Sequence, residues 1–342
     1  MIALVLGLVV VGAAGGVFLA NRRVYAASET LNRVQENGRV SFELLARDLR
    51  EAGGSPCGVP FGRDNGFVNM LRRTTATEWT SALFTTGIRG TEAGTTDSVD
   101  LALSGESGLR RIVDASNPAS HVEVDDATGI KEGDLVLACN SEKAILFEVR
   151  GLTGNDKKIR FNGGRNCAST LLGNDPDLNC AAAKNGFPGA ACFTGGTCGA
   201  WVAERYKDAS GNLVYPPAYV VSTGGVRWHI ANNDRGGTSL YRARLDGSAG
   251  GWTIVNRGEE IAEGVSRLQL RYRRANAPAS GFRPANEIPA DQWGQVNAVE
   301  VAITTVGVAG NLSASDVQGT DKAPLERTFT YVVALRNREG GA

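Results

Sequence analysis

Histidine, the side chain that most often carries acid–base or metal chemistry, is scarce in this chain of 342 residues. Two histidines occur, His121 and His229, and neither lies near a nucleophile signature. Because histidine is the commonest general base and metal ligand, this scarcity argues against most hydrolases and against a His-rich metal site. The sequence also contains no GxSxG elbow, Walker A loop or HExxH helix. We therefore expect neither enzymatic activity nor a cofactor.

One polar run resembles half of a calcium-binding loop. Asp175, Asp177 and Asn179 alternate as the oxygen ligands of such a loop do. The pattern then fails, because Cys180 replaces the glycine of the sixth position and Gly186 stands where a bidentate glutamate belongs. An Asx-rich turn is favoured over a calcium site, and we expect no resident metal.

The charges of the chain balance. Lysine plus arginine number 36 and aspartate plus glutamate number 36, so no net field gathers a polyanion over a long distance. A local group of arginines at 271, 273, 274 and 283 is better explained as a solvated face than as a nucleic-acid site. We expect no nucleic-acid partner.

The cysteines indicate an oxidising compartment, because their number is even and four of them crowd one glycine- and asparagine-rich segment. They are Cys57, Cys139, Cys167, Cys180, Cys192 and Cys198. The last four follow the spacing C-x12-C-x11-C-x5-C, without a CxxC pair or a nearby histidine, which favours two disulfides over zinc. The sequence leaves all three pairings of those four open. By elimination, Cys57 and Cys139 would form the third bridge.

The N-terminus predicts one long helix in two parts. Residues 1–20 carry no charge and would span about 30 Å of hydrocarbon as a transmembrane helix. Residues 21–53 continue as an amphipathic helix. In the apolar part, Gly12, Gly16 and Ala20 form a small-xxx-small row that would let another helix approach closely, although ordinary glycine usage in membrane helices explains the row equally well.

Two signals disagree about the topology. Arg22 and Arg23 follow the apolar run, and the positive-inside rule alone would place the rest of the chain in the cytoplasm. The cysteine content instead places it in an oxidising compartment. We give the cysteines more weight and expect an extracytoplasmic domain.

After the helix, residues 54–342 read as a β-rich globular domain. Apolar residues alternate with period two, and Gly, Asn and Asp separate the runs, so antiparallel hairpins are favoured. The pair Gly224 and Gly225 is expected to form a turn before one of these strands. Residues 163–199 lack strand formers and are expected to be an inserted Cys-rich loop. The predicted class is α+β, and its strands cover residues 97–103, 133–139, 144–152, 226–232, 239–247, 267–272, 296–306 and 327–338.

Several motifs together carry a family resemblance. The apolar helix runs into RVQENGR at 33–39 and LARDLREAGG at 45–54, and later blocks follow in order. Those blocks are LVLACNSEKAILFEV at 135–149, SLYRARLDG at 239–247, EGVSRLQLRY at 263–272 and VALRNR at 333–338. In this order they resemble PilW-type minor pilins. Residues 56–92 and the Cys-rich insert show no such likeness.

The resemblance implies a type IV pilin-like fold, with the long helix packed on an antiparallel sheet. It implies a single-pass protein of the bacterial inner membrane, whose C-terminal domain lies in the periplasm until the subunit enters a pilus on the cell surface. Its partners would be other minor pilins, the major pilin, the inner-membrane assembly platform and, in some systems, a tip adhesin. The implied function is priming and capping of the pilus, and through it twitching motility and cell adhesion.

Two alternatives stay open at this level. A type II secretion pseudopilin shares the long helix and the sheet domain. A membrane-anchored periplasmic binding or adhesive domain would use loops, which leave no readable motif.

The start of the sequence departs from the family pattern. Prepilins that resemble this chain begin with a short basic leader and carry a glutamate at the fifth mature position, whereas here the apolar run opens at Met1. We hypothesise that a leader and the first mature residues precede Met1 in the full gene product. An in-frame stop codon immediately upstream of Met1 would contradict this.

Overall fold

The computed structural model describes the chain from residue 2 to residue 338 with gaps. The described residues are 2–58, 67–69, 71, 83–104, 108–114, 121–141, 144–155, 157–161, 166, 206–207, 213–214, 217–246, 253–254, 257–307 and 325–338.

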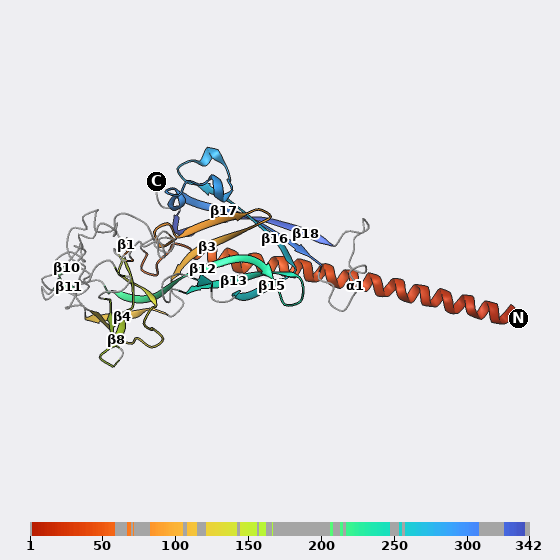
Figure 1. The fold of residues 1–342 in the computed structure, drawn as a ribbon, viewed down its shortest axis with the longest axis horizontal. Coiled ribbons are helices and arrows are strands. Elements are labelled where there is room, and N and C mark those ends of the chain that lie inside the picture. The colour runs from red at the N-terminus through yellow and green to blue at the C-terminus, as the bar shows by residue number, and fades with distance from the viewer. Residues whose placement is uncertain are drawn as a thin grey trace.

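A single helix, α1 (Ile2–Glu51), dominates the shape of the molecule. Its N-terminal part projects far from the body, and its C-terminal part lies along the sheets (Figure 1). The helix ends where Gly53 adopts a φ of 71°, a left-handed conformation that favours glycine and is common just after a helix. The single long helix was predicted from the sequence, and its observed end at Glu51 lies two residues before the predicted end at residue 53.

Strands make up most of the body, in three sheets. Their bounds are β1 (Phe67–Asn69), β2 (Ile88–Ala93), β3 (Thr96–Ser104), β4 (Arg110–Asp114), β5 (His121–Val124), β6 (Leu135–Cys139), β7 (Ala144–Glu148), β8 (Gly151–Thr153), β9 (Lys158–Arg160), β10 (Tyr206–Lys207), β11 (Leu213–Val214), β12 (Tyr219–Asn232), β13 (Thr238–Asp246), β14 (Thr253–Ile254), β15 (Glu259–Glu263), β16 (Val265–Arg274), β17 (Val296–Val306) and β18 (Glu326–Ala334). Among the described residues, short 3-10 helices accompany them, namely η1 (Pro278–Ser280), η2 (Ala285–Glu287), η3 (Trp293–Gln295) and η5 (Arg336–Arg338).

The longest strand, β12, connects two lobes. Its first residues pair with β6 and β4, and its later residues pair with β3 and β13. We call β4 to β9 the distal lobe, since β4 and β8 lie at the end of the molecule far from the N-terminus (Figure 1). We call the second half of α1 with β3, β13 and β15 to β18 the proximal lobe. Described pairings are antiparallel except that of β1 with β7.

Each lobe has its own core. In the proximal lobe, Leu45 and Leu49 of α1 pack with Trp228 and with apolar residues of β16, β17 and β18. In the distal lobe, Phe147 and Phe161 contact each other edge to face within a separate apolar cluster. A third apolar cluster includes Phe84, Leu137 of β6 and Val221 of β12. The body extends along the axis of α1 (Figure 1).

The three-stranded sheet β16-β17-β18 covers α1. Strand β18 runs in the same direction as α1, since Phe329 lies at Gly38, Tyr331 lies at Phe42 and the residues after the strand reach the end of the helix. Strand β18 is also an edge of its sheet, because β17 is its pairing partner among the described residues.

The prediction of a turn at Gly224 and Gly225 was wrong. Both lie inside β12, which passes through them while pairing with β3. A Cβ atom on Gly225 would lie 2.5 Å from Cδ1 of Leu245, so the absence of a side chain allows β13 to approach closely. Glycine here serves packing within a strand and does not reverse the chain.

The predicted α+β class is correct: a long N-terminal helix is followed by antiparallel sheets. The strand predictions at 97–103, 133–139 and 296–306 each correspond to one observed strand. The region 144–152 divides into β7 and the start of β8. Apart from Asn166, which is buried, the expected insert at 163–199 lies outside the described residues.

Candidate functional site

The part of α1 that leaves the body has an apolar surface with no cover. Its large apolar side chains between residues 2 and 19 are exposed by 55% (Leu19) to 79% (Ile2). Covering a single such side chain is worth about 1.5–3 kcal/mol, so this surface as a whole demands a nonaqueous environment. Among the described residues, α1 is the helix long and apolar enough to cross a membrane.

The three small residues of the predicted packing row lie on this uncovered part. Gly12 and Gly16 would each accept a Cβ without meeting another atom within 4 Å, and Ala20 is exposed. The chain itself therefore places nothing against the row. A contact with another helix stays a prediction.

Where α1 enters the body, a buried carboxylate fixes it to the sheet. Oδ2 of Asp48 accepts hydrogen bonds from Nε1 of Trp228 at 2.9 Å and from Nε of Arg242 at 2.7 Å. The side chain of Asp48 is 9% exposed and that of Arg242 is 22% exposed, so the ion pair is largely removed from water. Hydrogen bonds to charged groups in such a setting are stronger than neutral ones. Asp48 therefore joins the helix to β12 and β13 at once.

We call the contacts that hold the second half of α1 to the sheets the joint. Further contacts of the joint lie closer to the N-terminus of the helix. The rings of Phe42 and Tyr331 stack with centroids 3.8 Å apart. Nδ2 of Asn37 donates to the carbonyl of Glu263 at 2.8 Å. Gly38 lets the ring of Phe329 lie directly on the helix backbone, because a Cβ there would fall 2.5 Å from Cε2.

The end of α1 is held by the end of the chain. The side-chain amide of Asn337 lies 3.3 Å from the carbonyl oxygen of Glu51 and 3.4 Å from that of Ala52. Carbonyls in the last turn of a helix lack partners inside the helix, so this amide supplies a donor that they need. Asn337 belongs to the VALRNR block noted in the sequence, which explains why a C-terminal motif accompanies an N-terminal helix.

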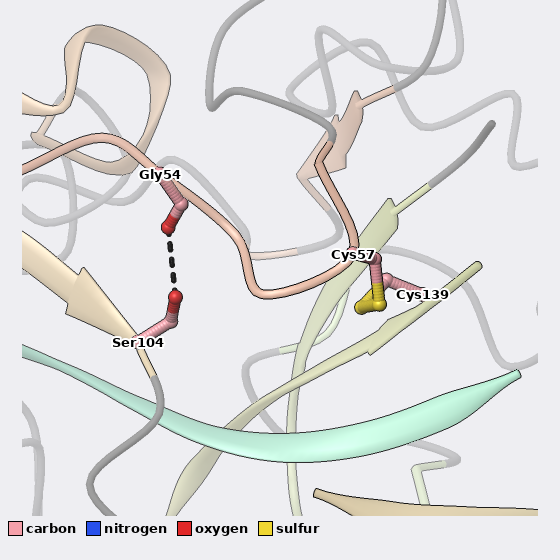
Figure 2. The surroundings of a disulfide bond; sticks show 4 residues. All are labelled: Gly54, Cys57, Ser104 and Cys139. Atoms are coloured by element: carbon pink, nitrogen blue, oxygen red, sulfur yellow. Dashed lines mark hydrogen bonds between the residues drawn. A yellow bond between two sulfur atoms is a disulfide. The ribbon is translucent and has the colours of Figure 1, made fainter. Parts of the chain in front are cut away.

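Directly beyond the helix, a disulfide ties the chain to β6. Cys57 bonds to Cys139 at the end of that strand, and the two residues are 82 positions apart in the sequence (Figure 2). Next to it, Oγ of Ser104 donates to the carbonyl of Gly54 at 2.7 Å (Figure 2). The pairing of Cys57 with Cys139, expected by elimination, is confirmed.

Other predicted site residues lie outside the described residues. These are Cys167, Cys180, Cys192 and Cys198, together with the calcium candidates Asp175, Asp177 and Asn179. Within the described part of the chain, no group of three or more His, Cys, Asp or Glu side chains is arranged to hold a metal ion.

The histidine of β12 is placed by packing. His229 stacks on Tyr241 with ring centroids 5.9 Å apart. Burial, and then the nearby charge of Arg227, lower the pKa of His229. Arg227 itself is held by Asp100 on the neighbouring strand, through Nε to Oδ1 at 2.6 Å. This arrangement disfavours the charged form of the imidazole and holds the ring within a sheet.

Sequence reasoning missed the polar residues of the joint. Asp48 is acidic, and an acidic residue of an amphipathic helix is usually assigned to the solvent side. A signal was nevertheless present, because Asp48 is spaced three residues from Leu45 and four from Ala52, both of which are buried. A carboxylate in an apolar stripe predicts a buried partner.

Comparison with known proteins gives this arrangement a family context. Residues 227–337 match the model of the family described as Type IV Pilus-assembly protein W. We call residues 227–337 the PilW segment because of this match. The resemblance noted in the sequence is thereby confirmed. This PilW segment supplies most of the groups that hold α1: Trp228, Arg242, Glu263, Tyr331 and Asn337.

Among solved structures, the type IV-like pilin TTHA1219 from Thermus thermophilus is similar at 12% identity. The match covers 34% of this chain and 67% of that one with a TM-score of 0.18, which is too low to carry an argument. No curated protein matches the chain. The PilW match and the long apolar N-terminal helix together support a type IV pilus-related pilin.

Proposed function

We propose that this chain is a minor pilin that helps to prime and cap the type IV pilus with other minor pilins. One observation carries the proposal: the segment that matches PilW is the segment that grips α1, while the other half of α1 presents an apolar surface without cover. A subunit built this way has a folded domain attached to an apolar helix, and the exposed half of that helix must be covered by lipid or by other proteins.

Two environments would bury that helix. In the inner membrane, lipid covers its apolar part over about 30 Å. In a filament, the apolar helices of neighbouring subunits offer equivalent cover, so the helix exchanges one apolar surrounding for another. The small residues Gly12, Gly16 and Ala20 would let neighbouring helices approach closely at this stage.

The cysteines support a periplasmic position for the domain. The bond between Cys57 and Cys139 belongs to an oxidising compartment. The partners we propose are other minor pilins, the major pilin and the inner-membrane assembly platform, with a tip adhesin as a further partner. We propose no enzymatic role.

A deletion strain tests the proposed function. We expect surface fibres and twitching motility to be lost or sharply reduced, and a tagged full-length chain to recover other pilin subunits from gently solubilised membranes. Recovery of secretion pseudopilins would indicate the type II secretion alternative. Normal fibres with no recovered pilin would contradict the proposal and leave a membrane-anchored binding domain.

A steric substitution tests the small-residue row. We expect Gly16→Leu to reduce fibre number, because a larger side chain separates helices that meet at this row. The matched control is Gly7→Leu, which makes the same chemical change in the same apolar helix but outside the row. Fibre counts by electron microscopy are the measurement. Equal counts in the two variants would show that the row has no packing role.

A further inference from the structure

We propose that Arg22 and Tyr25 of α1 bind the phosphate group of a membrane phospholipid, at the level where the helix leaves the hydrocarbon. The inference goes beyond the proposed function, because it requires a membrane around the first part of α1 but no pilus.

A short stretch of α1 lies between its apolar part and its contacts with the body. Arg22 and Tyr25 are exposed in this stretch. Farther along the helix, Ala27 is half-buried and Thr30 is 4% exposed, so the rest of the chain shelters the helix from there on. Residues 21–26 extend about 9 Å along the helix axis. The headgroup layer on each side of a bilayer is about 5–8 Å thick, so this stretch crosses it and places both side chains within it.

The charge of Arg22 has no anionic partner within the residues that the structure describes. Elsewhere in α1, Arg33, Arg39 and Arg47 each form an ion pair with a glutamate four positions away. The acidic residue nearest to Arg22 in the sequence is Glu29, seven positions on, and Glu29 pairs with Arg33 at 2.7 Å. At the edge of the hydrocarbon, where water is less available, the guanidinium of Arg22 is stabilised by an anion from outside the chain.

Arg22 and Tyr25 are neighbours on the surface of the helix. Positions three apart bring their Cβ atoms to about 5–6 Å from each other. The Cα–Cβ bonds of a helix tilt toward its N-terminus, which here is the membrane side. A guanidinium offers a fork of donors that matches two phosphate oxygens, and a tyrosine ring favours the headgroup level. Tyr25 is 79% exposed, so the described chain leaves this position open.

The arrangement of polar residues favours lipid over a protein as the partner. Positions 21, 22 and 23 are all polar in the sequence. Consecutive positions of an α-helix lie about 100° apart around its axis, so polar positions surround the helix at this level. A protein partner covers one side of a helix, whereas a headgroup layer surrounds it. The uncovered apolar surface of residues 2–19 also leads directly into this level, so the lipid that covers that surface reaches Arg22.

Solid-state NMR of the full-length chain tests the site. Fluorotyrosine replaces Tyr25 in bilayers of phosphatidylglycerol, and a matched chain carries the label at Phe18, seven positions earlier on the same side of the helix and within the apolar part. We expect a dipolar coupling between fluorine and phosphorus at Tyr25 and none at Phe18, because freely diffusing lipids average this coupling to zero and a bound lipid does not. The coupling at Tyr25 should disappear in Arg22→Gln. It should stay in Arg39→Gln, which removes an exposed arginine of the same helix farther from the membrane.

Bilayers without phosphate separate a lipid from a free anion. Digalactosyldiacylglycerol forms such bilayers, and we expect no coupling at Tyr25 when inorganic phosphate is added to them. A coupling there would show that the site binds free phosphate and would overturn the proposal. The proposal also fails if the coupling in phosphatidylglycerol persists in Arg22→Gln, is absent from Tyr25, or is present at Phe18.

Lipid retention gives a second measurement. We expect native mass spectrometry of the detergent-solubilised chain to show about tenfold less bound phosphatidylglycerol in Arg22→Gln than in the unmodified chain, and no change in Arg39→Gln. Equal retention in all three chains would contradict the proposal. Both variants alter exposed residues, and an unchanged circular dichroism spectrum verifies folding. These samples contain no other pilin, so failure of the lipid site leaves the proposed function to be decided by the deletion strain.

Discussion

At the scale of single residues, Ser41 shows how a buried polar atom can weaken a helix joint. Its side chain is fully buried, and its hydroxyl has no hydrogen-bond partner among the residues that the structure describes. An unsatisfied buried hydroxyl costs about 1–3 kcal/mol relative to a satisfied one. Serine is also a poorer helix former than alanine.

We therefore expect Ser41→Ala to stabilise the folded chain by about 1 kcal/mol. The exposed Ser28 of the same helix provides the control, because Ser28→Ala changes helix propensity without removing a buried hydroxyl. Urea unfolding in detergent measures both variants. A midpoint for Ser41→Ala below that of the unmodified chain would mean that the hydroxyl has a partner in solution.

His229 makes a prediction about pH. Because burial and Arg227 lower its pKa in the folded chain, the unfolded chain binds the proton at a higher pH than the folded chain does. Stability then rises with pH wherever the unfolded state holds more protons. The contribution of His229 is fully present above about pH 6.5 and is lost as the pH falls below that value.

We expect the urea concentration at the unfolding midpoint to decrease when the pH is lowered from 7.5 to 5.5. The decrease should be smaller in His229→Gln. Asp97 acts in the opposite direction at lower pH, since burial raises its pKa, and so it does not produce this effect. Equal slopes in the two chains would assign the pH dependence to other groups.

At the scale of elements, the joint between α1 and the sheets depends on one carboxylate. Asp48→Ala would leave Nε1 of Trp228 and the guanidinium of Arg242 without their shared acceptor. Breaking a fully buried ion pair costs about 3–5 kcal/mol, and since Arg242 keeps some contact with water we expect a loss of about 2–3 kcal/mol.

The control for Asp48 is Glu43→Ala on the exposed side of the same helix. Glu43 pairs with Arg39 at 2.8 Å, but both side chains are mostly exposed, so its removal should destabilise the chain far less than removal of Asp48 does. Thermal unfolding monitored by tryptophan fluorescence distinguishes the two, because Trp228 reports directly on the joint. Equal losses would contradict the special role of Asp48.

The sequence predicted elements better than it predicted the contacts between them. The helix and the strand at 296–306 follow from strong periodicities of about 3.6 and of two. The turn predicted at Gly224 and Gly225 was wrong because a glycine pair is common in turns. Here Gly225 lies within a strand, where the lack of a side chain allows Leu245 to pack closely. Short strands such as β8 and β9 were missed or misplaced because three residues carry too little pattern to detect.

At the scale of the whole molecule, the bond between Cys57 and Cys139 connects the segment just after α1 to β6, a strand of the distal lobe. A bridge between residues 82 positions apart restricts a long stretch of the unfolded chain. We expect Cys57→Ala with Cys139→Ala to lower the free energy of unfolding by about 4 kcal/mol. Urea unfolding of the double variant under nonreducing conditions measures this, and an unchanged midpoint would contradict it.

The parallel course of α1 and β18 has a mechanical consequence. A pull along the axis of α1 loads together, in shear, the contacts that Gly38, Phe42 and Asp48 of the helix make with the sheets, so these contacts resist as a group and do not break one at a time. Past the end of the helix, the covalent link from Cys57 to Cys139 carries the tension into β6. The N-terminal helix and the distal lobe are thus connected along one load-bearing line.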